Sequence, residues 1–234
     1  MFSRVVFKRG TKVEGESPFW ISFADLMSAL MVLFLVVMAV TLIQVTKKLT
    51  IEEKSTLQRK QDIDVILKLL KKDALQDSVK MDGDSLKINL GTIVKFESGS
   101  AFIKPDAAKY LRNYIPTLLS AKDTPEGQRW MRRIVVEGYT DTDGTYLYNL
   151  RLSQDRSRSV VCELFAAPSA GETPLTESQL RQVQDLFLVG GYSFNNEKNS
   201  AEESRRVEMR IEFLGPFENR MPALDNIEFG KCPI

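Results

Sequence analysis

The chain has 234 residues, with 32 basic and 31 acidic side chains, two cysteines and no histidine. The lack of histidine excludes Ser-His-Asp and Cys-His nucleophiles and imidazole-based zinc sites, and two cysteines are too few for a structural zinc site. Without a glycine-rich phosphate loop or a basic stripe, the sequence predicts no enzyme, no metal or cofactor site and no direct nucleic-acid partner.

Residues 1–17 form a short polar leader, and the apolar segment that follows is too long for a cleaved signal peptide. We predict one uncleaved transmembrane helix over residues 18–46. Its apolar run from Phe19 to Val45 would be about 40 Å long as a helix, enough to cross a hydrocarbon core of about 30 Å. Basic residues flank both ends, so charge alone leaves the orientation open.

Asp25 is the only charged residue in that apolar run. A carboxylate at such a position costs about 2.5 kcal/mol or more on insertion scales, so it requires a function or a partner. Helical spacing puts Ser22, Asp25, Ser28 and Ala29 on one small, polar face, whose hydroxyls can hydrogen-bond a protonated carboxyl. We expect Asp25 to relay ions, either protons or sodium, with Ser22 and Ser28 beside it. A structural ion pair with a partner subunit is the alternative.

Residues 47–80 are rich in Lys, Glu, Asp and Leu and contain neither Pro nor Gly. Apolar residues recur there at helical spacing, namely Ile63, Ile66, Leu67, Leu70 and Ala74. This pattern predicts a helical linker. The linker either pairs with a copy of itself or lies against its own domain.

Residues 81–214 have the pattern of one soluble domain. Alternating apolar residues predict strands around 86–90, 134–137, 186–192 and 207–213. Helices are expected to begin near Pro105, over residues 147–165, and after a capping box formed by Thr176 and Gln179. The order β-α-β-α-(α)-β-β predicts an α+β sandwich with helices on one sheet face.

Residues 215–234 are expected to form an irregular C-terminal tail. Cys232 lies in this tail, 70 positions after Cys162. In an oxidising compartment the two could form a disulfide that fastens the tail. A buried free Cys162 with Cys232 on a loose tail is the alternative.

The second candidate site is the segment from Gly138 to Val161. Asp141 follows a predicted strand, just before a helix on which Asn149, Ser153 and Arg156 share one face. An acidic group beside a guanidinium suits a zwitterionic ligand, because the carboxylate holds an ammonium and the guanidinium a carboxylate. A local salt bridge is the structural alternative.

Residues 86–214 resemble the OmpA-like peptidoglycan-binding domains. The resemblance rests on Thr140-Asp141, on Asn149, on Leu152-Ser153-x-x-Arg156 and on Arg205-Arg206-Val207-Glu208; family members carry an asparagine where this chain has Ser204. It implies that Asp141 and Arg156 grip the diaminopimelate unit of the cell-wall stem peptide. Thr140, Asn149, Ser153 and Arg206 belong to the same implied site.

An Asp-bearing membrane helix joined to such a domain is similar to the MotB class of ion-driven stator subunits. Within that class, residues 17–40 most resemble the ZorB family of the Zorya anti-phage defence systems. The resemblance implies a homodimer inside a pentameric ring of ZorA-like multi-span subunits, driven by protons that cross at Asp25. It also implies a single-pass protein of the bacterial inner membrane, with a cytoplasmic N-terminus and a periplasmic domain. A flagellar stator subunit and a passive envelope tether are the alternatives.

Overall fold

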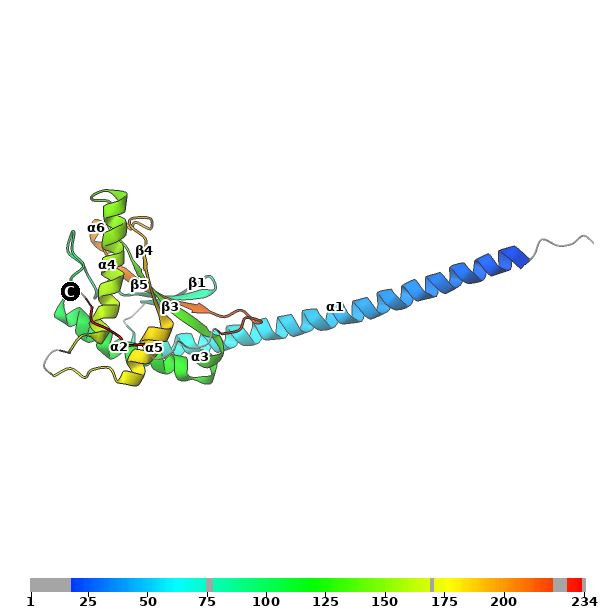
Figure 1. The fold of residues 1–234 in the computed structure, drawn as a ribbon, viewed down its shortest axis with the longest axis horizontal. Helices are drawn as coiled ribbons and strands as arrows, with labels where there is room; N and C mark the ends of the chain where they lie inside the picture. The colour runs from blue at the N-terminus through cyan, green and yellow to red at the C-terminus, as the bar shows by residue number, and fades with distance from the viewer. Residues whose placement is uncertain (1–17, 75–77, 169–170, 221–226, 233–234) are drawn as a thin grey trace, which may run out of the picture. The chain divides into compact units, whose positions relative to one another are not determined.

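The computed structural model describes residues 18–74, 78–168, 171–220 and 227–232. The expected leader, residues 1–17, lies outside this part of the chain. The first element, α1, is one continuous helix from Pro18 to Asp73 (Figure 1). Within the described residues, α1 is the one helix long and apolar enough to cross a membrane. The chain forms two compact units, residues 1–54 and residues 55–234.

The second unit is built on one five-stranded sheet, in the spatial order β1-β2-β5-β3-β4. The strands are β1 (Val79–Asp82), β2 (Ser85–Asn89), β3 (Met131–Gly138), β4 (Phe187–Gly191) and β5 (Val207–Phe213). Only the β3–β4 pair is parallel among the described strands, because the chain between them crosses over through two helices. The other three pairs are antiparallel.

Five further helices complete the described part of this unit. They are α2 (Pro105–Asp123), α3 (Pro125–Trp130), α4 (Tyr146–Phe165), α5 (Glu177–Leu186) and α6 (Ala201–Ser204). Their first turns carry ordinary stabilising signals: Pro105 lies in the first turn of α2, and Thr145 Oγ1 caps α4 by accepting from the Tyr148 N–H. The expected capping box at α5 is present, since the side chains of Thr176 and Gln179 accept from each other's backbone N–H.

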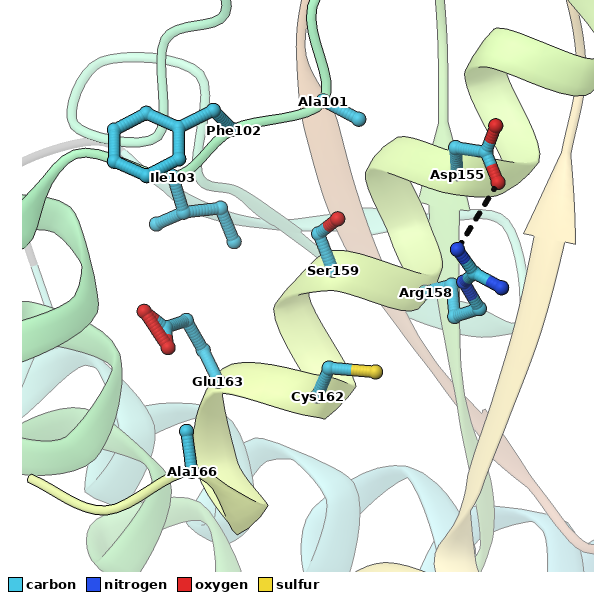
Figure 2. Close-up of a pocket in the computed structure, with 9 residues that line it drawn as sticks. All are labelled: Ala101, Phe102, Ile103, Asp155, Arg158, Ser159, Cys162, Glu163 and Ala166. Atoms are coloured by element: carbon cyan, nitrogen blue, oxygen red, sulfur yellow. Dashed lines mark ion pairs between the residues drawn. The ribbon is translucent and has the colours of Figure 1, made fainter. Parts of the chain in front are cut away.

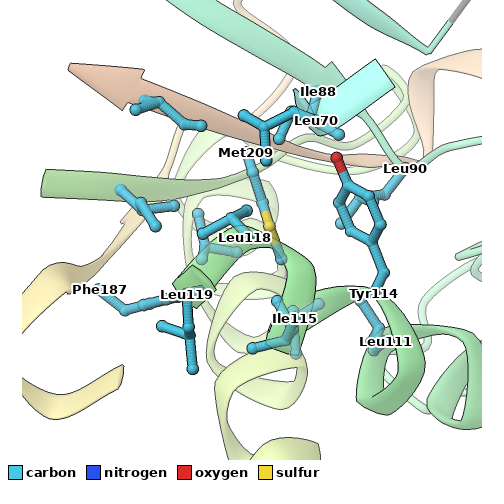
Figure 3. Close-up of a cluster of buried hydrophobic side chains, with 14 of the residues drawn as sticks. Leu70, Ile88, Leu90, Leu111, Tyr114, Ile115, Leu118, Leu119, Phe187 and Met209 are labelled. Carbon is cyan, nitrogen blue, oxygen red and sulfur yellow. The ribbon is translucent and has the colours of Figure 1, made fainter. Parts of the chain in front are cut away.

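The core fills the space between the sheet and the helices on one of its faces. Met209 extends from β5 toward Ile115 and Leu118 of α2, and Phe187 of β4 closes the cluster beside Leu119 (Figure 3). Helices α4 and α5 add Val160, Leu164, Val183 and Leu186 to the same core. Burial of this many large apolar side chains is the main stabilising term of such a domain.

The end of α1 belongs to this core. Ile63, Ile66 and Leu70 are buried in it. Polar contacts add to this packing: Arg59 Nε donates to the Leu214 carbonyl at 2.8 Å, and Asp62 Oδ2 accepts from Trp130 Nε1 at 2.7 Å. Of the two interpretations of the linker, the structure shows the helix lying against its own domain from about Ser55 onward.

The C-terminal tail has no helix or strand in its described residues, 215–220 and 227–232. Arg220 donates to the carbonyls of Gln128 and Met131, at 2.8 and 2.6 Å. Further along, Cys232 forms a disulfide with Cys162 of α4, with Cα atoms 5.7 Å apart. Several contacts therefore hold the tail against the helices.

The α+β fold class is confirmed, and each of the seven predicted strands and helices of the domain is present. Three short elements were not anticipated. Strand β1 forms a hairpin with β2 through Gly83 and Asp84, while α3 and α6 are helices of six and four residues.

Candidate functional site

The candidate site lies where β3 ends and α4 begins, and two glycines determine its geometry. Gly138 of β3 and Gly191 of β4 are neighbours in the sheet register. A Cβ on Gly138 would lie 1.9 Å from the Ser153 carbonyl oxygen, and one on Gly191 would lie 2.6 Å from the Gln154 backbone nitrogen. The backbone of α4 therefore rests directly on the sheet, which leaves no room for a side chain at either position.

Arg156 lies on the sheet side of α4 and is completely buried. Its guanidinium donates to three carbonyl oxygens, those of Ser100 at 2.9 Å, Tyr139 at 2.9 Å and Glu97 at 3.1 Å. The Phe96 ring lies 5.1 Å from its Cζ atom. Arg156 thus ties the loop before α2 to the end of β3, in addition to any role toward a ligand.

The charge on Arg156 persists at neutral pH. Burial, and to a smaller extent the neighbouring Arg205, lower the pKa of Arg156 to about 10, while Asp141 acts in the opposite direction. A guanidinium with that pKa still carries its proton at pH 7, so the buried group acts as a cation next to Asp141.

Asp141 pairs with Arg205. The distance from Arg205 Nη1 to Asp141 Oδ2 is 2.8 Å, and the two side chains are 18% and 7% exposed. Arg205 Nε also donates to the Phe96 carbonyl at 3.1 Å. This pair is partly shielded from water, so it interacts more strongly than an ion pair at the open surface.

The remaining small polar residues of the predicted site are fully buried around this pair. Ser153 Oγ accepts from the Ser193 N–H at 3.0 Å, and Asn149 Nδ2 donates to the Asp143 carbonyl at 2.8 Å. Thr140 Oγ1 and Asn149 Oδ1 are buried without a hydrogen-bond partner. Such orphaned acceptors at a loop–helix junction are positions where a bound water or ligand group would restore a hydrogen bond.

Arg206 is placed elsewhere in the domain. Its Nε donates to Glu208 at 2.8 Å, its Nη1 donates to the Asn196 carbonyl at 3.1 Å, and its Cζ lies 4.1 Å from the centre of the Tyr139 ring. Burial, and next the Glu137 carboxylate, raise the pKa of Tyr139, so its hydroxyl stays protonated and donates to Glu137 at 2.9 Å.

This arrangement belongs to the sheet face opposite the helices. There Glu137 and Glu208 lie directly across from each other in the β3–β5 register. Both carboxylates are buried, and Arg206 and Arg210 pair with Glu208 and Glu137 respectively. Arg206 therefore neutralises part of a buried charge network.

Ser204, at the family's asparagine position, also has a local role. Its Oγ accepts from the Lys198 N–H at 2.9 Å and donates to the Ser200 carbonyl at 2.9 Å. These bonds fix the loop that leads to Arg205. The substitution thus keeps a polar anchor for the loop.

The pair Asp141–Arg205 retains binding capacity. Asp141 contacts Arg205 through Oδ2, and Arg205 uses Nη1 for this contact and Nε for the Phe96 carbonyl. Asp141 Oδ1 can therefore accept from an ammonium, while Arg205 Nη2 can donate to a carboxylate. The geometry suits a small ligand that carries both groups close together.

Arg205 is the residue of this site that the sequence interpretation missed. The sequence signal that could have identified it was the alternation of side chains along a strand, because residues i and i+2 lie on the same face. Arg206 lies two positions before Glu208 and pairs with it, so Arg205 must project the other way.

Asp25 belongs to the first unit and lies in the first third of the apolar run of α1. Together with Ser28 and Ala29 it borders a shallow depression that continues along the same helix face past Val32 and Val36. Ser28 Oγ donates to the Asp25 backbone carbonyl at 2.9 Å, so this contact leaves the carboxylate itself unengaged. Large apolar side chains cover the rest of this segment and are exposed in the single chain.

Comparisons with known proteins agree along most of the chain. A family described as "Membrane MotB of proton-channel complex MotA/MotB" matches residues 7–54. Zorya protein ZorB of Escherichia coli O139:H28 is 41% identical over 224 residues, which cover 95% of this chain and 91% of that protein. A second Zorya protein ZorB, from Escherichia coli strain Crooks, is 24% identical over 89% of this chain and 93% of its own length.

Among solved structures, the periplasmic domain of Helicobacter pylori MotB is similar at 19% identity and a TM-score of 0.40, over 57% of this chain and 86% of that chain. A putative MotB-like protein from Desulfovibrio vulgaris is similar at 16% identity and a TM-score of 0.43, over 69% of this chain and 98% of that chain.

Proposed function

This chain belongs to the ZorB family, and on that basis we propose that it is the membrane-anchored, peptidoglycan-binding subunit of a proton-driven rotary motor in anti-phage defence. The observation that carries the proposal is the 41% identity to Zorya protein ZorB over 95% of the chain. The match of residues 7–54 to the MotB family supports the ion-driven part of the proposal.

Asp25 acts as the relay carboxylate in this proposal. A lone acid in an apolar helix is costly unless it is protonated or paired, and it becomes useful when protons reach it from one side and leave on the other. Ser22 and Ser28 lie within one turn of it on the same face. Each proton taken up removes the charge from Asp25, which lets this helix face move against its partner without a bare carboxylate in lipid.

The domain supplies the fixed point against which the motor turns. Asp141 binds the ammonium of a diaminopimelate unit in the cell-wall stem peptide, and the carboxylate of the same unit is bound by Arg205 together with the charge of Arg156 beneath it. Thr140, Asn149 and Ser153 line the same junction. Support comes from the short Asp141–Arg205 contact and from the orphaned oxygens of Thr140 and Asn149.

The proposed assembly is a homodimer of this subunit inside a pentameric ring of ZorA-like multi-span subunits in the bacterial inner membrane. The N-terminus lies in the cytoplasm and the domain in the periplasm, where it reaches peptidoglycan. An oxidising periplasm is the compartment in which the Cys162–Cys232 disulfide is stable.

The decisive experiment replaces Asp25 by Asn in the complete complex. We expect loss of proton flux into vesicles that hold the complex, and loss of protection in a phage plaque assay. Membrane insertion and sedimentation with purified peptidoglycan should stay unchanged, because the domain is not altered. Asp64→Asn is the matched control, since it removes a half-exposed carboxylate from the same helix beyond the apolar run.

Retained flux and protection in Asp25→Asn would support a passive envelope tether instead. A flagellar role is the other alternative, and the MotB family match gives it a specific basis. Rescue of swimming in a host that lacks its own stator would favour that role over defence.

A further inference from the structure

A cavity of about 440 Å³ lies beside α4, on the flank of the candidate wall-binding site. One wall is the stretch Ala101–Ile103 and the other is a stripe along α4 that includes Ser159, Cys162 and Glu163 (Figure 2). Ser159 and Glu163 point from α4 toward the loop that carries Phe102 and Ile103. A cavity of this size is in the range that holds small-molecule ligands.

The cavity combines an aromatic ring with polar groups. Phe102 is 70% exposed, although the next residue, Ile103, is buried. An exposed phenyl ring at the edge of a hollow is a binding feature when its partner has an apolar face and a polar rim. A pyranose ring has this shape, because its axial C–H groups form one apolar face and its hydroxyls point outward.

The charges around the cavity fit a neutral ligand. Arg158 Nη2 lies 3.4 Å from Asp155 Oδ1, and Glu163 Oε2 lies 3.4 Å from Arg112 Nη2. Because each of these ionic groups already has an opposite charge beside it, an ionic ligand gains little here. The hydroxyl of Ser159 and the carboxylates of Asp155 and Glu163 remain suitable acceptors for sugar hydroxyls.

One short loop, residues 97–103, contacts Arg156 of the stem-peptide site and also lines the cavity. Arg156 holds the Ser100 carbonyl at 2.9 Å, and Ser100 Oγ accepts from the Phe102 N–H at 3.1 Å. The residue that organises the peptide site therefore also fixes the backbone that presents Phe102.

From this geometry we infer that the cavity binds an N-acetylated pyranose of the glycan strand, attached to the stem peptide held at Asp141 and Arg205. The inference rests on the proposed function and extends it from the peptide to the sugar. Phe102 stacks on the sugar ring, and Ser159 lines the opposite wall.

The test compares two soluble probes on the full chain in detergent, by titration calorimetry. One probe is a diaminopimelate-containing tripeptide without sugar, and the other is the same tripeptide attached to the N-acetylglucosamine–N-acetylmuramic acid disaccharide. The unsubstituted chain should bind the second probe about tenfold more tightly. Phe102→Ala and Ser159→Leu should each remove that difference and leave the affinity for the tripeptide unchanged. Phe217→Ala is the matched control, because Phe217 is 66% exposed and does not line the cavity.

Each other outcome decides against the inference. Equal binding of both probes to the unsubstituted chain, or an unchanged sugar preference in both cavity variants, would show that the cavity is not a glycan site. Equal losses for both probes in Phe102→Ala would place the peptide, rather than the sugar, against the ring. Failure of the proposed function is distinguishable, since then neither probe binds, or Asp141→Asn leaves both affinities unchanged.

Discussion

At the scale of single residues, the paired arginines 205 and 206 have different surroundings. Arg205 reaches Asp141, whereas Arg206 is buried against Glu208 on the other face of the sheet. We predict that Arg205→Ala weakens sedimentation with peptidoglycan by at least about tenfold, because a hydrogen bond to a charged group contributes about 1.5–3 kcal/mol. Arg132→Ala is the control, since it removes one cation from a half-exposed surface pair. Equal sedimentation of the two variants would refute the assignment of Arg205.

The sequence was sufficient to find Asp141 and Arg156 as candidates, because their spacing follows a motif. It could not supply the acceptors of Arg156. The Glu97 and Ser100 carbonyls are 59 and 56 positions away along the chain, and only the folded loop brings them together. The choice between Arg205 and Arg206 was within reach, since strand alternation separates the two side chains.

At the scale of elements, the close packing of α4 against the sheet depends on Gly138. An alanine there would place Cβ 1.9 Å from the Ser153 carbonyl oxygen, which is backbone and cannot rotate away. We predict that Gly138→Ala lowers the free energy of unfolding by about 3 kcal/mol, the upper part of the range for overpacking. Chemical denaturation followed by tryptophan fluorescence measures this, with Trp130 buried in the domain.

Gly215→Ala is the matched control for this substitution. Its Cβ would meet the Glu218 side chain at an ordinary 3.5 Å, so stability should change by less than about 0.5 kcal/mol. Similar stability of the two variants would mean that α4 shifts easily on the sheet.

The end of α1 offers a second test at this scale. Ile66 is 1% exposed in the domain core, whereas its neighbour Val65 is 49% exposed. We predict that Ile66→Ala costs about 3 kcal/mol of unfolding free energy, as buried large-to-small changes do, and that Val65→Ala costs less than about 0.5 kcal/mol. Denaturation curves that coincide for the two variants would indicate a free linker helix.

Most strands and helices of the domain were predictable, because long runs with clear periodicity determine them. Strand β1 was not, since its four residues continue a charged segment and only Val79 is buried. The sequence signal for β1 was the two-residue turn at Gly83 and Asp84, which joins two alternating runs. In the structure Gly83 has the positive φ, 59°, that such a turn requires. The docking of α1 was left open by the sequence, because the same apolar spacing serves a coiled coil or a domain surface.

At the scale of the whole molecule, the tail fastens elements that are distant in sequence. It leaves β5 at Leu214, reaches the end of α3 through Arg220, and reaches α5 through Phe229, whose ring lies 4.2 Å from Arg181 Cζ. Phe229 also contacts Phe165 at the end of α4, with ring centroids 5.1 Å apart. The disulfide between Cys232 and Cys162 then attaches the tail covalently to α4.

This closure should make the stability of the domain depend on its compartment. A bridge across 70 positions restricts the unfolded chain, and the chain-entropy relation gives about 4 kcal/mol for a loop of that length. We predict that Cys232→Ser lowers the unfolding free energy by about that amount, and that reductant lowers the stability of the unsubstituted chain equally but leaves Cys232→Ser unchanged. Denaturation curves with and without reductant measure both effects. If the unsubstituted chain were insensitive to reductant, the packing of Phe229 and Arg220 alone would hold the tail, and the domain would be as stable in a reducing compartment as in an oxidising one.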